Sequence, residues 1–238
     1  MTTLTRIIVT SIISLLLLSC NFMAGVDGNG KVVSVERDIS SDFNEIKVSQ
    51  GLDLYITQSD NVSLSIEADE NLQDIIMTEV ENSVLRIYAA ENIRRATSKK
   101  IMLNIENISV IKATSGSDVY SNNTIEVSDL KLNSTSGADI KLDVKTESLN
   151  CHATSGSDIK LSGSTKKLIA KATSGSDIDA SELQAETSNV SATSGADISV
   201  NTSKSLIAKA TSGGDIRYSG NPENLETSDT SAGSVRKQ

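Results

Sequence analysis

The chain has 238 residues, of which 22 are Lys or Arg and 31 are Asp or Glu, so its formal net charge is −9. This acidic balance disfavours nucleic acids and anionic membrane surfaces as partners, because both are negatively charged. One His, two Cys, four Tyr, two Phe and no Trp leave little material for metal, nucleophilic or nucleotide chemistry. The sequence contains no motif of those kinds, so we expect no cofactor.

The first 19 residues are predicted to be a signal peptide. Arg6 precedes an uncharged apolar run over residues 7–18, which is too short to cross a bilayer comfortably. Leu17-Leu18-Ser19-Cys20 then resembles the site at which bacteria attach lipid to an amino-terminal cysteine, so Cys20 is the expected lipid-attachment residue. The alternative is an ordinary secretory signal that happens to end in Cys. Residues 20–30 contain three glycines and are expected to form a flexible tether.

Residues 31–108 are predicted to form an irregular β cap over the first open edge of a repeat region. Apolar residues flank Gly51 with the alternation of one repeat. Glu81-Asn82-Ser83 separates two apolar runs, as expected of a hairpin. A short helical turn is expected between residues 69 and 76.

Residues 109–238 repeat the segment Thr-Ser-Gly-x-Asp with a period near 20 residues. Its corner glycines are Gly116, Gly137, Gly156, Gly175, Gly195 and Gly213. Such a period indicates a solenoid, in which each circuit of the chain, here called a rung, stacks on its neighbours. Glycine permits the positive φ that a sharp corner between two strands requires. Ser231-Ala232-Gly233-Ser234 resembles a degenerate seventh corner.

Around each glycine, odd offsets are apolar and even offsets are polar, which is the pattern of half-buried strands. The predicted inward residues three after the glycine are Val119, Ile140, Ile159, Ile178, Ile198 and Ile216. Those three before it are Ala113, Ser134, Ala153, Ala172, Ala192 and Ala210, and their small size predicts a thin coil. The fold prediction is therefore all-β, a parallel β-helix or β-solenoid of about 20-residue rungs with an irregular β cap at its N-terminal end.

An aspartate follows each corner glycine by two positions, and these residues are Asp118, Asp139, Asp158, Asp177, Asp197 and Asp215. Stacked at ~4.8 Å, adjacent carboxylates repel by about 1 kcal/mol even in water. We expect each to accept backbone hydrogen bonds and to face solvent. The alternative is calcium, because Gly-x-Asp is half of a known calcium repeat, but the other half is missing here.

The internal cysteine and the single histidine offer no predicted chemistry. Cys151 falls at an inward offset and is expected to be a buried small hydrophobe. His152 shares an outward offset with several lysines and is expected to be solvated. No catalytic, metal-binding or cofactor-binding residues are therefore predicted.

Three segments together resemble one family of bacterial proteins: residues 37–48, residues 216–222 with the only proline, and residues 231–235. With the Ser-Gly-x-Asp repeats, they make the chain similar to the putative auto-transporter adhesin, head GIN domain family of Bacteroides-like lipoproteins. The resemblance implies an exported β-helix-like domain that acts in adhesion, with no known catalytic residues.

These features predict a lipid-anchored, adhesin-like binding module of the cell envelope, expected at the outer membrane, that is not an enzyme. Its expected partner is a glycan or a protein, with no nucleic acid and with membrane contact through the lipid alone. Two alternatives remain, a carbohydrate-active enzyme on a β-solenoid and a structural envelope protein. An acid pair in a groove beside aromatic residues would favour the enzyme.

Overall fold

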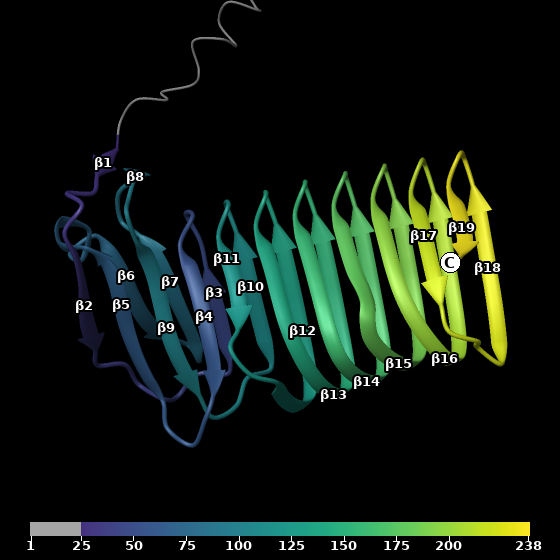
Figure 1. The fold of residues 1–238 in the computed structure, drawn as a ribbon, viewed down its shortest axis with the longest axis horizontal. Coiled ribbons are helices and arrows are strands. Elements are labelled where there is room, and N and C mark those ends of the chain that lie inside the picture. The colour runs from purple at the N-terminus through teal and green to yellow at the C-terminus, as the bar shows by residue number, and fades with distance from the viewer. Residues whose placement is uncertain (1–24) are drawn as a thin grey trace, which may run out of the picture.

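A computed structural model describes residues 25–238, which form one elongated stack of β-strands (Figure 1). The predicted signal peptide and Cys20 lie outside the described residues, as do residues 21–24. Within residues 25–238, no helix has the length and apolar character needed to span a membrane.

The repeat region forms the predicted parallel β-solenoid. Its strands are β10 (Val110–Thr114), β11 (Asp118–Ser121), β12 (Ile125–Thr135), β13 (Asp139–Thr154), β14 (Asp158–Thr173), β15 (Asp177–Thr193), β16 (Asp197–Thr211), β17 (Asp215–Ser219), β18 (Asn224–Thr230) and β19 (Ser234–Lys237). Equivalent positions of successive repeats pair in register, so that Asp139 lies opposite Asp158 and Ala153 opposite Ala172. The sequence period is therefore the length of one rung.

The N-terminal region forms a mixed β cap. Its elements are β1 (Val26–Asp27), β2 (Val32–Arg37), β3 (Glu45–Val48), β4 (Asp53–Gln58), β5 (Ser63–Asp69), the 3-10 turn η1 (Glu70–Leu72), β6 (Ile76–Glu81), β7 (Val84–Ala89), β8 (Ile93–Arg95) and β9 (Lys99–Ile105). Strands β2, β5 and β9 pair antiparallel, and β6 and β7 form the predicted hairpin. Antiparallel pairing gives the cap side an end that differs from the repeating rungs.

Parallel stacking begins inside the region predicted to be the cap. Strand β3 pairs in parallel with β10, and β4 pairs in parallel with β11. A corner at Gln50 and Gly51 joins β3 to β4. The segment around Gly51 therefore forms a rung of the solenoid. The chain then passes through β5–β9 before the first repeat stacks on this rung.

Each corner is made by two consecutive residues with positive φ. In a central rung, Ser174 has φ 59° and Gly175 has φ 65°. The N–H of Gly175 donates to the carbonyl of Ser194 in the next rung at 3.1 Å. A Cβ on Gly175 would meet no atom within 4 Å, so a side chain would fit there. The corner favours glycine because of its positive φ. The positive φ of the preceding serine was not predicted.

The last corner differs in detail from the predicted one. Ala232, with φ 62°, occupies the position of the corner glycine, because Ser234 pairs with Asp215. Gly233 therefore corresponds to Gly214. A Cβ on Gly233 would lie 2.6 Å from the carbonyl carbon of Ala210, so this glycine is required by close backbone approach.

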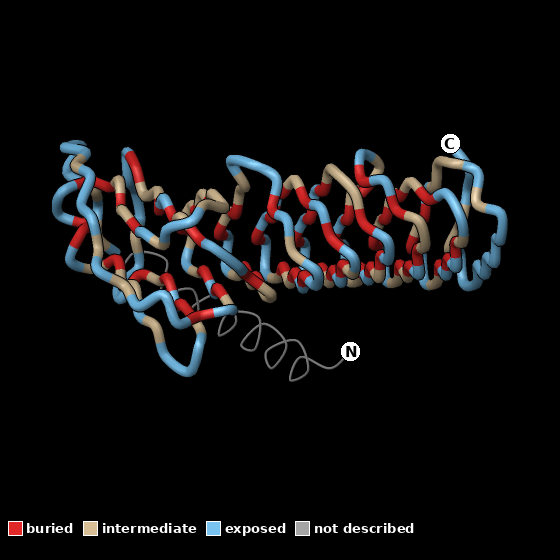
Figure 2. The backbone as a smooth tube through the Cα atoms, turned by 90° about the horizontal axis from the view of Figure 1, so that it is seen from below, coloured by how far each residue is buried: buried red, intermediate tan, exposed pale blue. Residues whose placement is uncertain are grey.

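Side chains at the predicted inward offsets fill the interior. Both inward sets and Cys151 are buried, and Figure 2 shows buried and exposed residues alternating along the strands. Burial raises the pKa of the Cys151 thiol, which favours the neutral form. At the C-terminal end the pattern stops, since every residue of β18 is exposed, including Leu225, Thr227 and Asp229 at inward register positions.

The described part of the expected tether is folded. Val26 and Asp27 pair in parallel with β8, and the N–H of Gly30 donates to Oδ1 of Asp69 at 2.5 Å. A Cβ on Gly28 would lie 2.6 Å from the Asp69 carboxyl carbon. Residues 26–30 are therefore part of the cap, because pairing with β8 and the buried Asp69 carboxylate overcome the flexibility of the glycines.

Candidate functional site

The aspartates form a ladder along one edge of the solenoid, as their spacing predicts. Asp53 of β4 extends it, since Asp53 pairs with Asp118 and the register then continues to Asp215. Burial and then the preceding carboxylate raise the pKa of Asp118, Asp139, Asp158, Asp177 and Asp197. The backbone N–H of the next aspartate opposes this rise at three of them, Asp139, Asp158 and Asp177.

The ladder does not assemble a metal centre. Within residues 25–238, no group of three or more His, Cys, Asp or Glu side chains is arranged to hold a metal ion. The carboxylates lie in a single row, one per rung, so each has at most one aspartate on either side.

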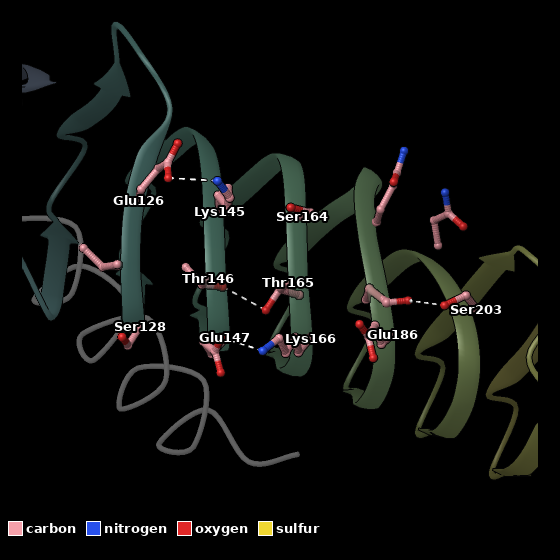
Figure 3. Close-up of a pocket in the computed structure, with 14 residues that line it drawn as sticks. Glu126, Ser128, Lys145, Thr146, Glu147, Ser164, Thr165, Lys166, Glu186 and Ser203 are labelled. Atoms are coloured by element: carbon pink, nitrogen blue, oxygen red, sulfur yellow. Dashed lines mark hydrogen bonds and ion pairs between the residues drawn. The ribbon is translucent and has the colours of Figure 1, made fainter.

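About midway along the chain between successive corners, a groove of about 790 Å³ crosses β12–β16 (Figure 3). We call it the ion-pair groove, because acids and lysines of successive rungs pair along it. Glu126 contacts Lys145 at 3.0 Å, and Glu147 contacts Lys166 at 2.6 Å. Beneath them, the buried Thr146 hydroxyl donates to that of Thr165 at 2.8 Å. Each charged side chain that lines this groove is thus in an ion pair, and the lining contains no aromatic side chain.

A second groove, of about 550 Å³, runs across five strands on the face that carries the aspartate ladder. We call it the tyrosine groove. In rung order its lining includes Tyr55 of β4, Tyr120 of β11, Lys141 of β13, Lys160 of β14 and Glu182 of β15. Their order follows the strand pairing, so the tyrosines lie at one end and Glu182 at the other.

The two tyrosines come from distant parts of the sequence and stack directly on each other. Tyr55 pairs in register with Tyr120, and their ring centroids are 5.1 Å apart with an interplanar angle of 24°. Met102 of β9 pairs with Tyr55 and is itself exposed. The result is a partly exposed apolar stack at the junction of the cap and the repeats.

The Tyr120 hydroxyl is held as a hydrogen-bond donor. It donates to Oδ2 of Asp118 at 3.3 Å. Burial, followed by the nearby negative charge of Asp118, raises the pKa of Tyr120 to about 12. The phenol therefore stays neutral over the physiological range, and its ring remains available for stacking.

The remaining polar groups of the tyrosine groove are only partly paired. Ser162 donates to Oδ2 of Asp143 at 2.7 Å, and Lys160 pairs with Asp179 at 3.4 Å. The side chains of Lys141 and Glu182 are exposed and make no ion pair or hydrogen bond with any residue in the described range.

Glu182 reaches this position because β15 has one more residue than β14 at this point. Lys160 pairs with Asp179, but Ser162 pairs with Glu182, so the register shifts by one between them. Such a bulge redirects the side chains that follow it. This irregularity forms the wall of the groove opposite the tyrosines.

Sequence reasoning missed this groove. No aromatic site is predicted from a sequence with four tyrosines, two phenylalanines and no tryptophan, yet two of the tyrosines stack on each other. The sequence does carry a sign of this stack, because Tyr55 and Tyr120 each lie four residues after a corner glycine.

His152 lies in the predicted outward row, and its pKa is lowered by partial burial and by Lys171 and Lys131.

Comparison with known proteins gives a consistent picture. Residues 42–222 match the family described as "Putative auto-transporter adhesin, head GIN domain". None of the curated proteins compared with the chain matches it. Two similar solved structures are putative adhesins. The one from Bacteroides fragilis has 21% identity and a TM-score of 0.83, covering 90% of this chain and 100% of that one. The one from Parabacteroides merdae has 22% identity and a TM-score of 0.73, covering 90% and 100%.

A third solved structure carries a different description. It is a putative lipid binding protein from Parabacteroides distasonis, with 25% identity, a TM-score of 0.73, and coverage of 90% of this chain and 99% of that one. All three share the fold over nearly their whole length.

Proposed function

Since the chain belongs to the putative auto-transporter adhesin, head GIN domain family, we propose that it is a non-catalytic, adhesin-like binding module of the bacterial cell envelope. The observation that carries the proposal is the tyrosine groove. It combines a stacked aromatic pair with unpaired charged side chains on a surface of paired strands. A groove of this kind is typical of a recognition site.

The rigidity of the scaffold supports a binding role. Apart from Asn122, the groove residues lie on strands, or at a bulge between strands, whose neighbours pair on both sides. Their relative positions are therefore fixed before a ligand arrives, which lowers the entropy lost on binding.

Attachment to the envelope is proposed to occur through lipid on Cys20 after removal of residues 1–19. The family supports an envelope location, and the sequence favours the outer membrane. The proposed partner is a glycan or a protein, and the membrane is contacted only through the lipid.

The test is a binding screen with the mature protein on arrays of immobilised glycans and extracellular proteins. We expect saturable binding to at least one of these classes. Failure to bind either class would contradict the proposal and favour the structural envelope role.

One observation supports a second candidate, a carbohydrate-active enzyme. Asp143 and Glu182 line the same groove as the tyrosines, and two carboxylates are sufficient for glycoside hydrolysis. Product analysis of any bound glycan separates the two functions. We expect no new reducing ends. Cleavage that is lost in Glu182→Gln would establish the enzyme instead.

A further inference from the structure

We propose that the tyrosine groove is a carbohydrate-binding site that accepts a neutral hexopyranose unit of a glycan. This inference rests on the proposed binding function and names the class of ligand. The two grooves differ in how their polar groups are paired. In the larger ion-pair groove the charged side chains form ion pairs with one another. The tyrosine groove instead has an aromatic stack and free polar groups.

The aromatic end supplies the apolar contact. A pyranose ring presents C–H groups on its faces, and a tyrosine ring can pack against such a face. Tyr55 and Tyr120 already stack along the solenoid axis. Tyr120 is the member next to Lys141 in the register, so a sugar lying over the Lys141 strand would continue the stack by one step.

The polar end supplies groups for hydroxyls. Lys141 can donate, Glu182 can accept, and neither must first break a protein contact. Asp143, already bonded by Ser162, retains a second carboxylate oxygen. One exposed carboxylate, one half-buried carboxylate and an ammonium group in one groove suit a ligand with several neighbouring hydroxyls.

Charge favours a neutral sugar over an acidic one. The two lysines of the groove are balanced by Asp143 and Glu182. The aspartate ladder runs along the same face, with Asp118 bonded to Tyr120 itself. A uronic or sialic acid would meet this row of carboxylates, which repels it.

The size of the groove agrees with this assignment. Its volume of about 550 Å³ lies within the range of about 300–1,000 Å³ typical of small-ligand sites. The strands of Tyr120 and Glu182 are three pairing steps apart in the register, or roughly 14 Å at ~4.8 Å per step. The groove is also open to solvent, so a longer glycan can extend beyond it.

The experiment uses the mature protein and an array of neutral glucan, mannan and galactan oligosaccharides beside uronic-acid oligosaccharides. A neutral oligosaccharide that binds is then titrated by calorimetry against the wild type and variants. We expect Tyr120→Ala to weaken binding by about tenfold or more, which corresponds to loss of a stacking contact of about 1.4 kcal/mol. We expect Tyr120→Phe, which keeps the ring, to bind within about threefold of the wild type, a difference of well under 1 kcal/mol.

Two further variants guard against a folding artefact. Glu182→Gln alters an exposed side chain and should weaken binding without changing the melting temperature. Tyr88→Ala removes a tyrosine that contacts Arg86 outside the groove and should leave the affinity unchanged. Melting curves confirm that each variant is folded.

The outcomes separate this inference from the proposed function. Selective binding of uronic-acid oligosaccharides, or neutral binding that is unaffected by both Tyr120→Ala and Glu182→Gln, overturns the inference and leaves a binding function intact. Binding to proteins but to no glycan does the same. Absence of binding to every glycan and protein overturns both.

Discussion

The backbone N–H of Gly30 donates to the carboxylate of Asp69 at 2.5 Å, across a separation of 39 residues in the sequence. The same carboxylate accepts from the N–H groups of Thr97 and Ser98 at 2.7 and 3.1 Å. One buried acid at the end of β5 therefore joins the segment between β1 and β2 to the segment between β8 and β9.

The Asp69 contact predicts a loss of cap stability in acid. Burial raises the pKa of Asp69, but hydrogen bonds from Ser98, Thr97 and Gly30 outweigh it, and the pKa is lowered from 3.8. The folded state thus favours the ionised form, so its stabilisation is full above pH 3.8 and is lost as the pH falls through the lowered value. Amide exchange at Gly30 and Thr97 should accelerate over that range.

Asp69→Asn is the matched variant for this prediction. The amide keeps the shape but does not titrate, so exchange at Gly30 should be faster at neutral pH and should lack the acid transition. Identical pH profiles in the wild type and this variant would contradict the assignment.

The aspartate ladder predicts the opposite dependence. Because burial and neighbouring carboxylates raise the pKa of Asp158 and Asp177 above 3.8, the folded state binds protons more tightly than the unfolded one. Their favourable contribution is full below pH 3.8 and is lost as the pH rises through the raised values. Replacing both with Asn should therefore raise the melting temperature at pH 7 and have little effect at pH 3.

Calcium provides the control for the ladder. We expect excess chelator to leave the wild-type melting temperature nearly unchanged. A fall of many degrees that calcium reverses, and that the double Asn variant lacks, would indicate a calcium ladder, because a folding ligand stabilises by its linkage free energy.

The corner geometry predicts a cost for any branched side chain at Gly175. Its φ of 65° is strained for an L-residue by roughly 1–2 kcal/mol, so Gly175→Val should lower the free energy of unfolding by more than about 1 kcal/mol. Urea unfolding measures this. Ser174→Gly is the companion variant, because it removes a Cβ at a positive φ and should leave stability unchanged or higher. Wild-type stability in Gly175→Val would contradict the corner assignment.

Anchoring is tested at Cys20. We expect Cys20→Ala to abolish labelling by a fatty-acid probe and to release the protein from the membrane fraction. Cys151→Ala is the control, since Cys151 is buried in the core and should keep both properties. Persistent membrane association of Cys20→Ala would rule out the lipoprotein assignment.

The rungs could be predicted because one strong period governs residues 116–215. The Ala and Ile offsets determine which faces are inward, and the glycines locate the corners, as the structure confirms at Gly116 and Gly175. The route of the cap could not be predicted, since β2, β5 and β9 pair antiparallel between segments with no shared period.

The tyrosine groove shows a different limit. Equal offsets from Gly51 and Gly116 are enough to predict that Tyr55 and Tyr120 are neighbours, once Gly51 is accepted as a corner. The position of Glu182 depends on the extra residue in β15. The corner glycines are 19 residues apart from Gly156 to Gly175 and 20 apart from Gly175 to Gly195, so the spacing assigns the extra residue to this rung. It does not specify where along β15 the register shifts.

The two ends of the stack differ, so we expect the stack to unfold from one of them. The cap side is closed by antiparallel strands, whereas all seven residues of β18 are exposed and Asp229 pairs with the buried Ala210 of the preceding rung. Figure 2 shows the exposed residues gathered at the C-terminal end of the stack. Since rungs in a solenoid contact only their immediate neighbours, stability is propagated from one to the next. Fraying should therefore start at β18 and β19 and move toward β11, so that amide protection forms a gradient and the tyrosine groove outlasts the tip.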